Sequence, residues 1–278
     1  MIIIEPLGGL ANRMRVIASA MFLGKKSHQK IKLIWIPSTD EINCEFSDLF
    51  KPIEGVEVTN TISKYKFARS TNQQSKFKQQ IFKVTNKIIG LDYCIKGKDL
   101  KDYHWNKKID IISTSSQKKN IYIRTYNDLY LENTKEHLRS FKPKENIQSV
   151  VDEITDKFSR NTIGIHIRRT DNDKSIEFSP TSIFIEHMTK ALKTNPNLNF
   201  FLATDDVKTE IKLKSLFKNK IMTYDKVLNR NLKEGIVDAV VDLYCLSKTK
   251  YIMGSYYSSF SEVASRIGKI KHKTLKKQ

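Results

Sequence analysis

The sequence predicts an α/β protein with two domains, and three observations support this. Residues 1–6 read as an apolar strand, a helically spaced apolar stretch follows, and residues 31–36 read as a second strand. A strand, a helix and a strand in that order are typical of a parallel sheet. The same alternation restarts after Pro143, and 278 residues suffice for two domains of ordinary size. We therefore expect domains at 1–142 and 143–278.

In the first domain, the opening strand meets Glu5 at once, so it does not read as a signal peptide. No apolar run approaches the ~18 residues that a membrane span requires. The helix after this strand is predicted from apolar positions Met14, Ile17, Ala18 and Met21. Residues 60–120 are weakly patterned and rich in Lys, Gln and Asn, and residues 120–126 are a further candidate strand.

The second domain begins with a predicted amphipathic helix after Pro143. We expect its buried face to hold Val150, Val151, Ile154 and Phe158. The elements that follow are predicted as strands at 162–169, 199–204, 221–224 and 251–254, and helices at 180–192, 207–217, 236–247 and 258–267. A lysine-rich tail is expected after residue 268.

Charge and cysteine content limit the function classes. The net charge of +19 permits nucleic acid, an anionic membrane or phosphorylated small molecules as partners, and it equally fits a solvated lysine-rich surface. No basic stripe interleaved with aromatic residues and no RNA- or DNA-binding signature is present. The cysteines, Cys44, Cys94 and Cys245, form no CxxC pair, so a reducing cytosol fits better than a disulfide framework or a zinc site.

The string "HIRRTD" at 166–171 follows an apolar strand. Alternation places Ile163, Ile165 and Ile167 on one face of the strand and Gly164, His166 and Arg168 on the other. Arg169, Thr170 and Asp171 fall at or beyond its carboxyl end. Ligands of open α/β sheets bind at that edge, and two guanidinium groups there can hold a diphosphate. The alternative is a surface ion pair between an arginine and Asp171.

Two more strand ends are polar. In "FLATDD" (201–206), Asp205 and Asp206 can bind a metal or hydroxyl groups, or cap the helix that follows. In "GSYYSSFSEVAS" (254–265), Ser258 or Ser259 can cap a helix, and the same groups can form an anion site at its N-terminus. Three polar strand ends in one α/β half are expected to converge on one crevice.

Two further features remain ambiguous from the residues alone. Asp242 has apolar neighbours on a predicted helix and therefore needs a strong partner, either the N–H edge of a guanine or an internal arginine. The string "LGGLANRM" places Gly9 between a strand and a helix, which allows close approach of a ligand to the backbone. Asn12 and Arg13 at this helix start contact either an anionic donor or solvent.

As a set, these strings resemble a known family. The chain is similar to the fucosyltransferase superfamily that includes the α1,6-fucosyltransferases and the nodulation fucosyltransferase, through "HIRRTD", "ATDD", "DAVVDLYCLSKTKYIMGSYYSSFSEVAS" and "GGLANRM". The α1,2-fucosyltransferases and protein O-fucosyltransferases are more distant. The resemblance is good over 162–265, moderate over 1–50 and absent over about 60–140.

That resemblance implies a GT-B-like fold, with two Rossmann-like domains facing a cleft, and an inverting glycosyltransferase that uses GDP-fucose without a metal or other cofactor. It implies that Arg168 holds the donor β-phosphate, with Arg169 and Asp171 shaping the same site. The other donor-binding residues it implies are Gly9, Asn12, Arg13, His166, Asp205, Asp206, Asp242, Ser258 and Ser259. Among these, His166 and Asp242 would meet the guanine.

The sequence departs from the α1,6 pattern after Asp171, where that group carries a lysine and then a glutamate. Glu177 and Asp173 are therefore both candidates for the acceptor-activating base. The chain resembles a bacterial, cytoplasmic enzyme of polysaccharide biosynthesis, which acts on a glycan or lipid-linked oligosaccharide at the inner face of the membrane. The alternatives are a transferase that uses another nucleotide sugar such as GDP-mannose, and a basic nucleic-acid-binding protein.

Overall fold

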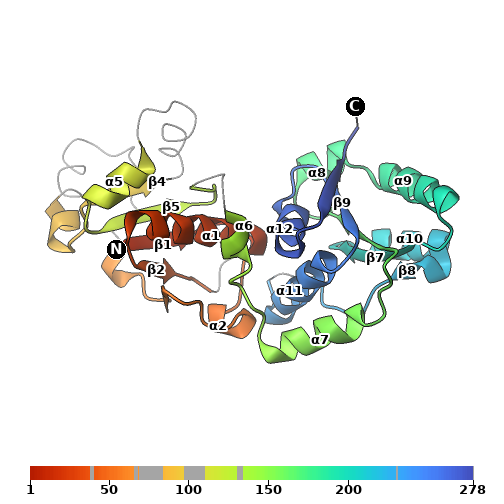
Figure 1. Ribbon diagram of the computed structural model, residues 1–278, viewed down its shortest axis with the longest axis horizontal. Helices are drawn as coiled ribbons and strands as arrows, with labels where there is room; N and C mark the ends of the chain where they lie inside the picture. The colour runs from red at the N-terminus through yellow and green to blue at the C-terminus, as the bar shows by residue number, and fades with distance from the viewer. Residues whose placement is uncertain are drawn as a thin grey trace. The chain divides into compact units, whose positions relative to one another are not determined.

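The structure is a computed structural model. It describes residues 1–37, 41–65, 68, 84–96, 110–129, 134–229 and 231–277. The chain divides into two compact units, Met1–Lys142 (unit 1) and Pro143–Gln278 (unit 2). Each unit holds a five-stranded sheet whose strand pairs are all parallel, with helices packed on it (Figure 1). The predicted α/β class is confirmed, whereas a cleft between two domains stays a prediction.

Unit 1 has the strand order β3-β2-β1-β5-β4. Its strands are β1 (Ile2–Pro6), β2 (Ile31–Ile34), β3 (Val56–Thr59), β4 (Tyr93–Lys96) and β5 (Ile121–Thr125). Its helices are α1 (Leu10–Ser27), α2 (Phe46–Leu49), α5 (Ile111–Gln117) and α6 (Thr134–Leu138), with a 3-10 turn η1 (Ser63–Tyr65). Strand β1 lies at the centre and is buried along its whole length, as is usual in a parallel sheet covered on both faces.

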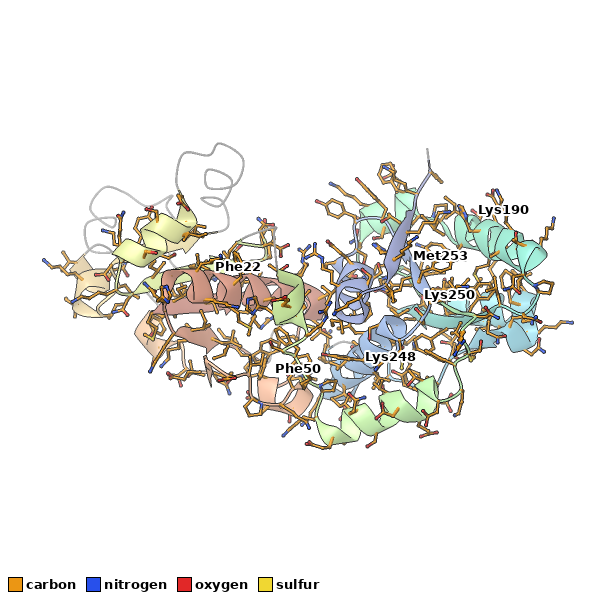
Figure 2. The ribbon with its side chains drawn as sticks, viewed as in Figure 1. Phe22, Phe50, Lys190, Lys248, Lys250 and Met253 are labelled. Carbon is orange, nitrogen blue, oxygen red and sulfur yellow. The ribbon has the colours of Figure 1, made fainter. Side chains whose placement is uncertain are left out.

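Two apolar layers hold unit 1 together. Helix α1 packs on the sheet next to α5 and α6, and the ring of Phe50 (labelled in Figure 2) packs edge-on against Phe141. On the other sheet face, Ile3 and Tyr122 are part of a second cluster, and Tyr122 stacks on Tyr65 at 5.9 Å. The sheet is therefore covered on both faces.

Unit 2 has the strand order β10-β9-β6-β7-β8. Its strands are β6 (Thr162–Ile167), β7 (Asn199–Thr204), β8 (Ile221–Met222), β9 (Tyr251–Ser255) and β10 (Lys271–Leu275). Its helices are α7 (Glu145–Thr155), α8 (Asp173–Phe178), α9 (Thr181–Thr194), α10 (Val207–Phe217), α11 (Lys233–Ser247) and α12 (Ser259–Gly268), with a 3-10 turn η3 (Lys218–Lys220). Helices α11 and α12 pack side by side (Figure 1).

Alternation along β6 builds the two sides of this sheet as predicted. Ile163, Ile165 and Ile167 lie in one buried cluster with Phe184 of α9, and Met253 of β9 (labelled in Figure 2) belongs to it. Chain order along the sheet reverses between β6 and β9, because β7 and β8 lie on one side of β6 while β9 and β10 lie on the other. The carboxyl ends of β6 and β9 therefore form the switch point at which open α/β sheets bind ligands.

Several predicted boundaries need correction. The strand predicted at 162–169 ends at Ile167, so both arginines lie beyond it. Val150 is exposed and Phe158 follows the end of α7, whose buried residues are Ile147, Val151 and Ile154. Helix α8 was not predicted.

The expected basic tail is in part strand β10, which pairs in parallel with β9. None of the described helices has the length and apolarity to cross a membrane.

Candidate functional site

The ends of β6 and β9 are joined by hydrogen bonds through Ser255, the last residue of β9. Its hydroxyl accepts a bond from the backbone N–H of Arg168 (3.1 Å) and donates one to the carbonyl of His166 (3.4 Å). The loop after β9 is fastened to helix α8 as well, because Ser175 donates to the carbonyl of Tyr256 at 2.6 Å. Two polar strand ends that were predicted to converge thus lie next to each other.

Arg168 is the cation at this switch point. Its Nε lies 3.2 Å from Asp205 Oδ2, and a terminal nitrogen forms an ion pair with Asp171. The side chain of Arg168 is 26% exposed, so each pair contributes little to stability and exchanges readily with a ligand's oxygens. The sequence left open whether Arg168 is a phosphate ligand or a member of an ion pair, and in the structure it is paired with two carboxylates.

Asp205 fixes the backbone around Arg168. One carboxylate oxygen accepts the N–H of Arg169 at 2.7 Å, and the other accepts the hydroxyl of Thr170 at 2.8 Å. With the pair to Arg168, this carboxylate contacts three successive residues. Its oxygens are therefore occupied by the loop, and the role that the contacts support is to orient Arg168.

Arg169 points back into unit 2. Its guanidinium donates to Thr181 Oγ1 at 3.1 Å, to the carbonyl of Arg168 at 2.7 Å and to the carbonyl of Ser179. Burial lowers the pKa of this guanidinium, and the nearby carboxylates of Asp205 and Asp206 act in the opposite direction. Arg169 therefore shapes the site by tying β6 to α8 and the start of α9.

The N-terminus of α12 supplies the second feature suited to an anion. Ser258 is its N-cap residue and makes no side-chain capping bond, and Ser259 begins the helix. Tyr257 before them has a left-handed φ of 58°, a conformation that costs energy for a tyrosine and is held here by Asn172, which donates to its carbonyl at 3.0 Å. The N–H groups of a first helical turn attract negative charge.

His166, near the end of β6, packs against α12. Its ring stacks on Phe260 with centroids 4.9 Å apart, and 5% of the residue is exposed. Burial first, and then the charges of Arg168, His272 and Lys226, lower the pKa of His166 to about 3, so the imidazole is neutral at physiological pH. Its Nδ1 atom is buried and has no hydrogen-bond partner within the described ranges.

Asp242 on α11 has a partner that the sequence did not indicate. The Nζ of Lys226, from the loop after β8, lies 2.9 Å and 2.7 Å from its two oxygens. Burial raises the pKa of Asp242 to about 6 in spite of the opposing charge of Lys226. Asp238, one helical turn earlier, accepts the N–H of Val227 at 2.7 Å, so both carboxylates hold the same loop.

The remaining carboxylates differ in exposure. Asp206 caps α10, since it accepts the N–H and the hydroxyl of Thr209 at 2.8 Å and 2.6 Å. Burial alone would raise its pKa, but the bonds from Thr209 lower it below the usual range. The two candidates for the base, Asp173 and Glu177, are both exposed on α8.

In unit 1, the predicted donor residues follow β1. Gly8 has a φ of 83°, which favours glycine, and Gly9 caps α1. Arg13 is 2% exposed, donates to the carbonyls of Gly8 (2.8 Å) and Ile36 (3.3 Å), and its guanidinium carbon lies 5.0 Å from the centre of the Trp35 ring. Burial lowers its pKa to about 10, against the attraction of Glu41 and Glu5.

Asn12, next to Arg13, accepts a bond from Arg15 at 3.3 Å. These contacts hold the glycine loop and the start of α1 in place.

Arg168, His166 and the start of α12 were predicted as site residues from the sequence, whereas Ser255 and Lys226, which the structure bonds to the strand ends and to Asp242, were not. Ser255 had a usable signal, because it stands at a predicted strand end beside Gly254. Lys226 had none, since it lies in a loop in which any of several lysines would fit the pattern. In the described part of the chain, no three His, Cys, Asp or Glu side chains gather as a metal ion would require.

Comparison with solved structures gives the fold a context. No protein-family model and no curated protein matches the sequence. The NodZ α-1,6-fucosyltransferase soaked with GDP-fucose matches with a TM-score of 0.61 and 18% identity, over 96% of this chain and 92% of that one. Another NodZ structure is described as from Bradyrhizobium. The chain has the fold of a fucosyltransferase.

Two further structures agree. A variant of Arabidopsis thaliana FUT1 in complex with GDP matches with a TM-score of 0.62 and 14% identity, over 98% of this chain and 69% of that one. POFUT1 in complex with GDP matches with a TM-score of 0.58 and 11% identity, over 99% and 98%. The resemblance predicted from the sequence is thus confirmed at the level of the fold.

Proposed function

We propose that this protein is a fucosyltransferase that takes L-fucose from GDP-fucose. The observation that carries the proposal is Arg168, a partly exposed guanidinium at the switch point of the sheet, whose backbone N–H is bonded to the last residue of β9, the strand that leads to α12. Its setting adds support, because the solved structures that share the fold include complexes with GDP and GDP-fucose. A guanidinium and a helix N-terminus together suit a diphosphate.

The donor residues have distinct roles in this proposal. Arg168 leaves Asp171 and binds the β-phosphate, while Ser258 and Ser259 with the first N–H groups of α12 bind the diphosphate. His166 contacts the guanine, and Asp205, Asp206 and Arg169 keep the loop and α10 in position. Because Lys226 occupies both oxygens of Asp242, we assign Asp242 to holding the loop after β8.

The proposed reaction is a single displacement without a metal ion. An acceptor hydroxyl attacks the anomeric carbon of fucose from the side opposite GDP, and the bond between that carbon and the β-phosphate oxygen breaks. GDP leaves with the electron pair, the configuration inverts, and Glu177, with Asp173 as the alternative, takes the acceptor's proton. Arg168 and the α12 N-terminus stabilise the charge that develops on GDP.

We place acceptor binding in unit 1. The stretch at about 60–140, which shares nothing with the family pattern, is proposed to select the acceptor, a surface glycan or oligosaccharide. The net charge of +19 favours an acceptor carried on an anionic membrane, as in bacterial polysaccharide synthesis at the inner face of the membrane.

A thermal-shift panel tests the donor. Wild type, Arg168→Ala and Arg160→Ala, an exposed arginine at the other end of β6, are heated with GDP, UDP, GDP-fucose, GDP-mannose or single-stranded RNA, with EDTA present. A ligand at a hundredfold excess over its Kd stabilises by about 2.7 kcal/mol. We expect stabilisation by GDP and GDP-fucose, none by UDP, and its loss in Arg168→Ala alone.

The other outcomes separate the alternatives. Stronger stabilisation by GDP-mannose than by GDP-fucose would mean that the donor sugar is mannose and not fucose. Stabilisation by RNA with none by any GDP compound would contradict the proposal and favour a nucleic-acid-binding protein.

A further inference from the structure

The carboxyl edge of the unit 1 sheet has a switch point of its own. In the order β3-β2-β1-β5-β4, β1 leads to β2 and β3 on one side, while β5 and β4 lie on the other. The two strands run side by side to their ends, where the N–H of Leu7 donates to the carbonyl of Thr125 at 2.8 Å. By the rule applied to unit 2, this edge is a place for a ligand.

A buried carboxylate stands at this point and holds an arginine. Glu5 of β1 and Arg124 of β5 are in register, and Arg124 Nε lies 3.1 Å from Glu5 Oε1. Tyr122, two residues earlier on β5, donates its hydroxyl to the other oxygen of Glu5. The Glu5 side chain is 2% exposed, so Arg124 is held by a buried carboxylate.

The ion pair with Glu5 involves only part of the Arg124 guanidinium. Its side chain is 34% exposed, and only its Nε takes part in the pair with Glu5. Its two terminal nitrogens have no hydrogen-bond partner among the residues that the structure describes. A guanidinium fixed through Nε presents its outer N–H groups as a ready fork for a carboxylate or a phosphate.

An exposed aromatic ring follows directly. Tyr126, two residues beyond Arg124 and just past the end of β5, is 56% exposed. Large aromatic side chains are usually covered in part, because their rings carry much apolar surface. A ring in this position offers the flat apolar surface on which the face of a sugar can stack.

We propose that Arg124 and Tyr126 form a binding site for an acidic sugar, with Glu5 and Tyr122 as the residues that position Arg124. The guanidinium takes the carboxylate or phosphate of the sugar, and the tyrosine ring takes its apolar face. Resting on the proposed function, this site makes the acceptor an acidic glycan. A carboxylate from a uronic acid and a phosphate on a sugar or lipid carrier share the required chemistry.

Proton–nitrogen NMR of the full chain tests the site. The protein is first titrated with GDP, which tests the proposed function separately and occupies Arg168. D-glucuronate, D-glucose 6-phosphate and D-glucose are then added one at a time, while the Nε–H signal of Arg124 and the backbone signals of Thr125 and Tyr126 are followed. We expect both acids to shift these signals in the millimolar range, and glucose at least about tenfold more weakly.

Variants distinguish the site from general attraction to a basic protein. Arg124→Gln should abolish the preference for acids, and Arg139→Gln, a half-buried arginine of the same unit, should retain it. Tyr126→Ala, at an exposed position, should weaken binding of all three sugars with the fold intact, as judged from the backbone spectrum. If Arg124→Gln disturbs that spectrum, Arg124→Lys replaces it, since lysine keeps the charge and loses the fork.

Each outcome decides the inference. A response to glucuronate alone assigns the site to uronic acids, and a response to the phosphate alone assigns it to phosphorylated sugars. An equal response to glucose, no response to either acid, or an unchanged preference in Arg124→Gln overturns it. If GDP does not bind, the proposed function is contradicted. The sugar titration is then carried out in buffer without GDP, and its result decides the acidic-sugar site by itself.

Discussion

Two arginines follow the central strands of the two sheets, and their surroundings are opposite. Arg168 comes directly after β6, is 26% exposed and pairs with the carboxylates of Asp171 and Asp205. Arg13 follows β1 by one turn of helix, is 2% exposed and donates to the carbonyls of Gly8 and Ile36 over the ring of Trp35. One guanidinium can exchange its partners for a ligand, and the other is part of the core.

This difference shows what a motif leaves open. Both arginines belong to strings that resemble the same family, and the resemblance implied donor contacts for both. The surroundings separate them, because partly exposed carboxylate partners can be replaced by a phosphate, whereas buried carbonyl partners leave unsatisfied oxygens when the arginine leaves. We therefore expect changes at the Arg168 edge to alter binding and chemistry, and changes around Arg13 to alter stability.

The largest effect is expected at the exposed carboxylates of α8. Glu177→Gln should slow the release of GDP from GDP-fucose by about 10²- to 10⁴-fold, because an amide cannot accept the proton of the attacking hydroxyl or water. Asp173→Asn should stay close to wild type, as should the control Glu186→Gln, an exposed glutamate on α9. If Asp173→Asn slows GDP release instead, Asp173 is the base. If neither variant slows it, the base does not lie on α8.

Replacement of Arg13 should act on the fold. In Arg13→Met, two carbonyls lose charged donors and Glu5 and Glu41 lose a nearby positive charge, so we expect the free energy of unfolding to fall by about 3–5 kcal/mol. Urea denaturation measures this, with Lys30→Met, an exposed cation of unit 1, as the control. A stable Arg13→Met protein that binds GDP-fucose poorly would make Arg13 a donor contact after all.

The buried ion pair between Asp242 of α11 and Lys226 should make the free energy of unfolding depend on pH. Since the pKa of Asp242 is raised to about 6, the folded state holds a proton that the unfolded state releases near pH 4. The contribution of Asp242 to the free energy of unfolding is fully present below about pH 4 and is lost as the pH rises through about 6. The loss over this range is roughly 2–3 kcal/mol.

Urea denaturation of wild type and Asp242→Asn between pH 4 and 7 isolates this contribution as the difference between the two slopes. In Lys226→Met the loss should continue to higher pH, because the charge that lowers the pKa of Asp242 is gone. The control Lys212→Met, on the exposed side of α10, should follow wild type. Identical slopes in wild type and Asp242→Asn would contradict the assignment.

The smallest effect is expected at the cap of α10. Asp206→Ala removes a carboxylate that accepts two bonds from Thr209, and loss of such a cap costs about 1 kcal/mol. Thermal denaturation should show this loss, while calorimetry finds the Kd of GDP unchanged. Asp225→Ala, an exposed aspartate of the same unit, is the control, and a large rise in the Kd of Asp206→Ala would restore a direct nucleoside contact.

Local pattern was enough to predict most elements of unit 2. The bounds predicted for β7 and α10 match the structure, because an apolar strand ends there in two aspartates and the second caps a helix. Strand β10 was missed since its residues, Lys-His-Lys-Thr-Leu, lack apolar alternation, and it pairs at the edge through its backbone. Helix α8 is short, and its cap, Asn172, depends on a loop folded against Tyr257.

The site was predictable only as far as neighbouring residues define it. The convergence of the strand ends followed from the parallel sheet, and Arg168 and the α12 start were predicted as site residues in this way; their roles stay predictions. The pairing of Asp242 with Lys226 was beyond sequence reasoning, because it joins residues 16 positions apart through a loop without a pattern. The burial of Arg13 could not be predicted from the sequence either, because it depends on Trp35 and Ile36, which follow the end of another strand.

The most direct test of the account compares two nucleotides that differ by one phosphate. Calorimetry gives the Kd of GDP and GMP for wild type, Arg168→Ala and the control Arg160→Ala. If Arg168 binds the β-phosphate, Arg168→Ala weakens GDP by about tenfold to a hundredfold and leaves GMP nearly unchanged, so the preference for GDP collapses. A preference for GDP that survives in Arg168→Ala would contradict the central claim and leave Arg168 as a strand-end ion pair.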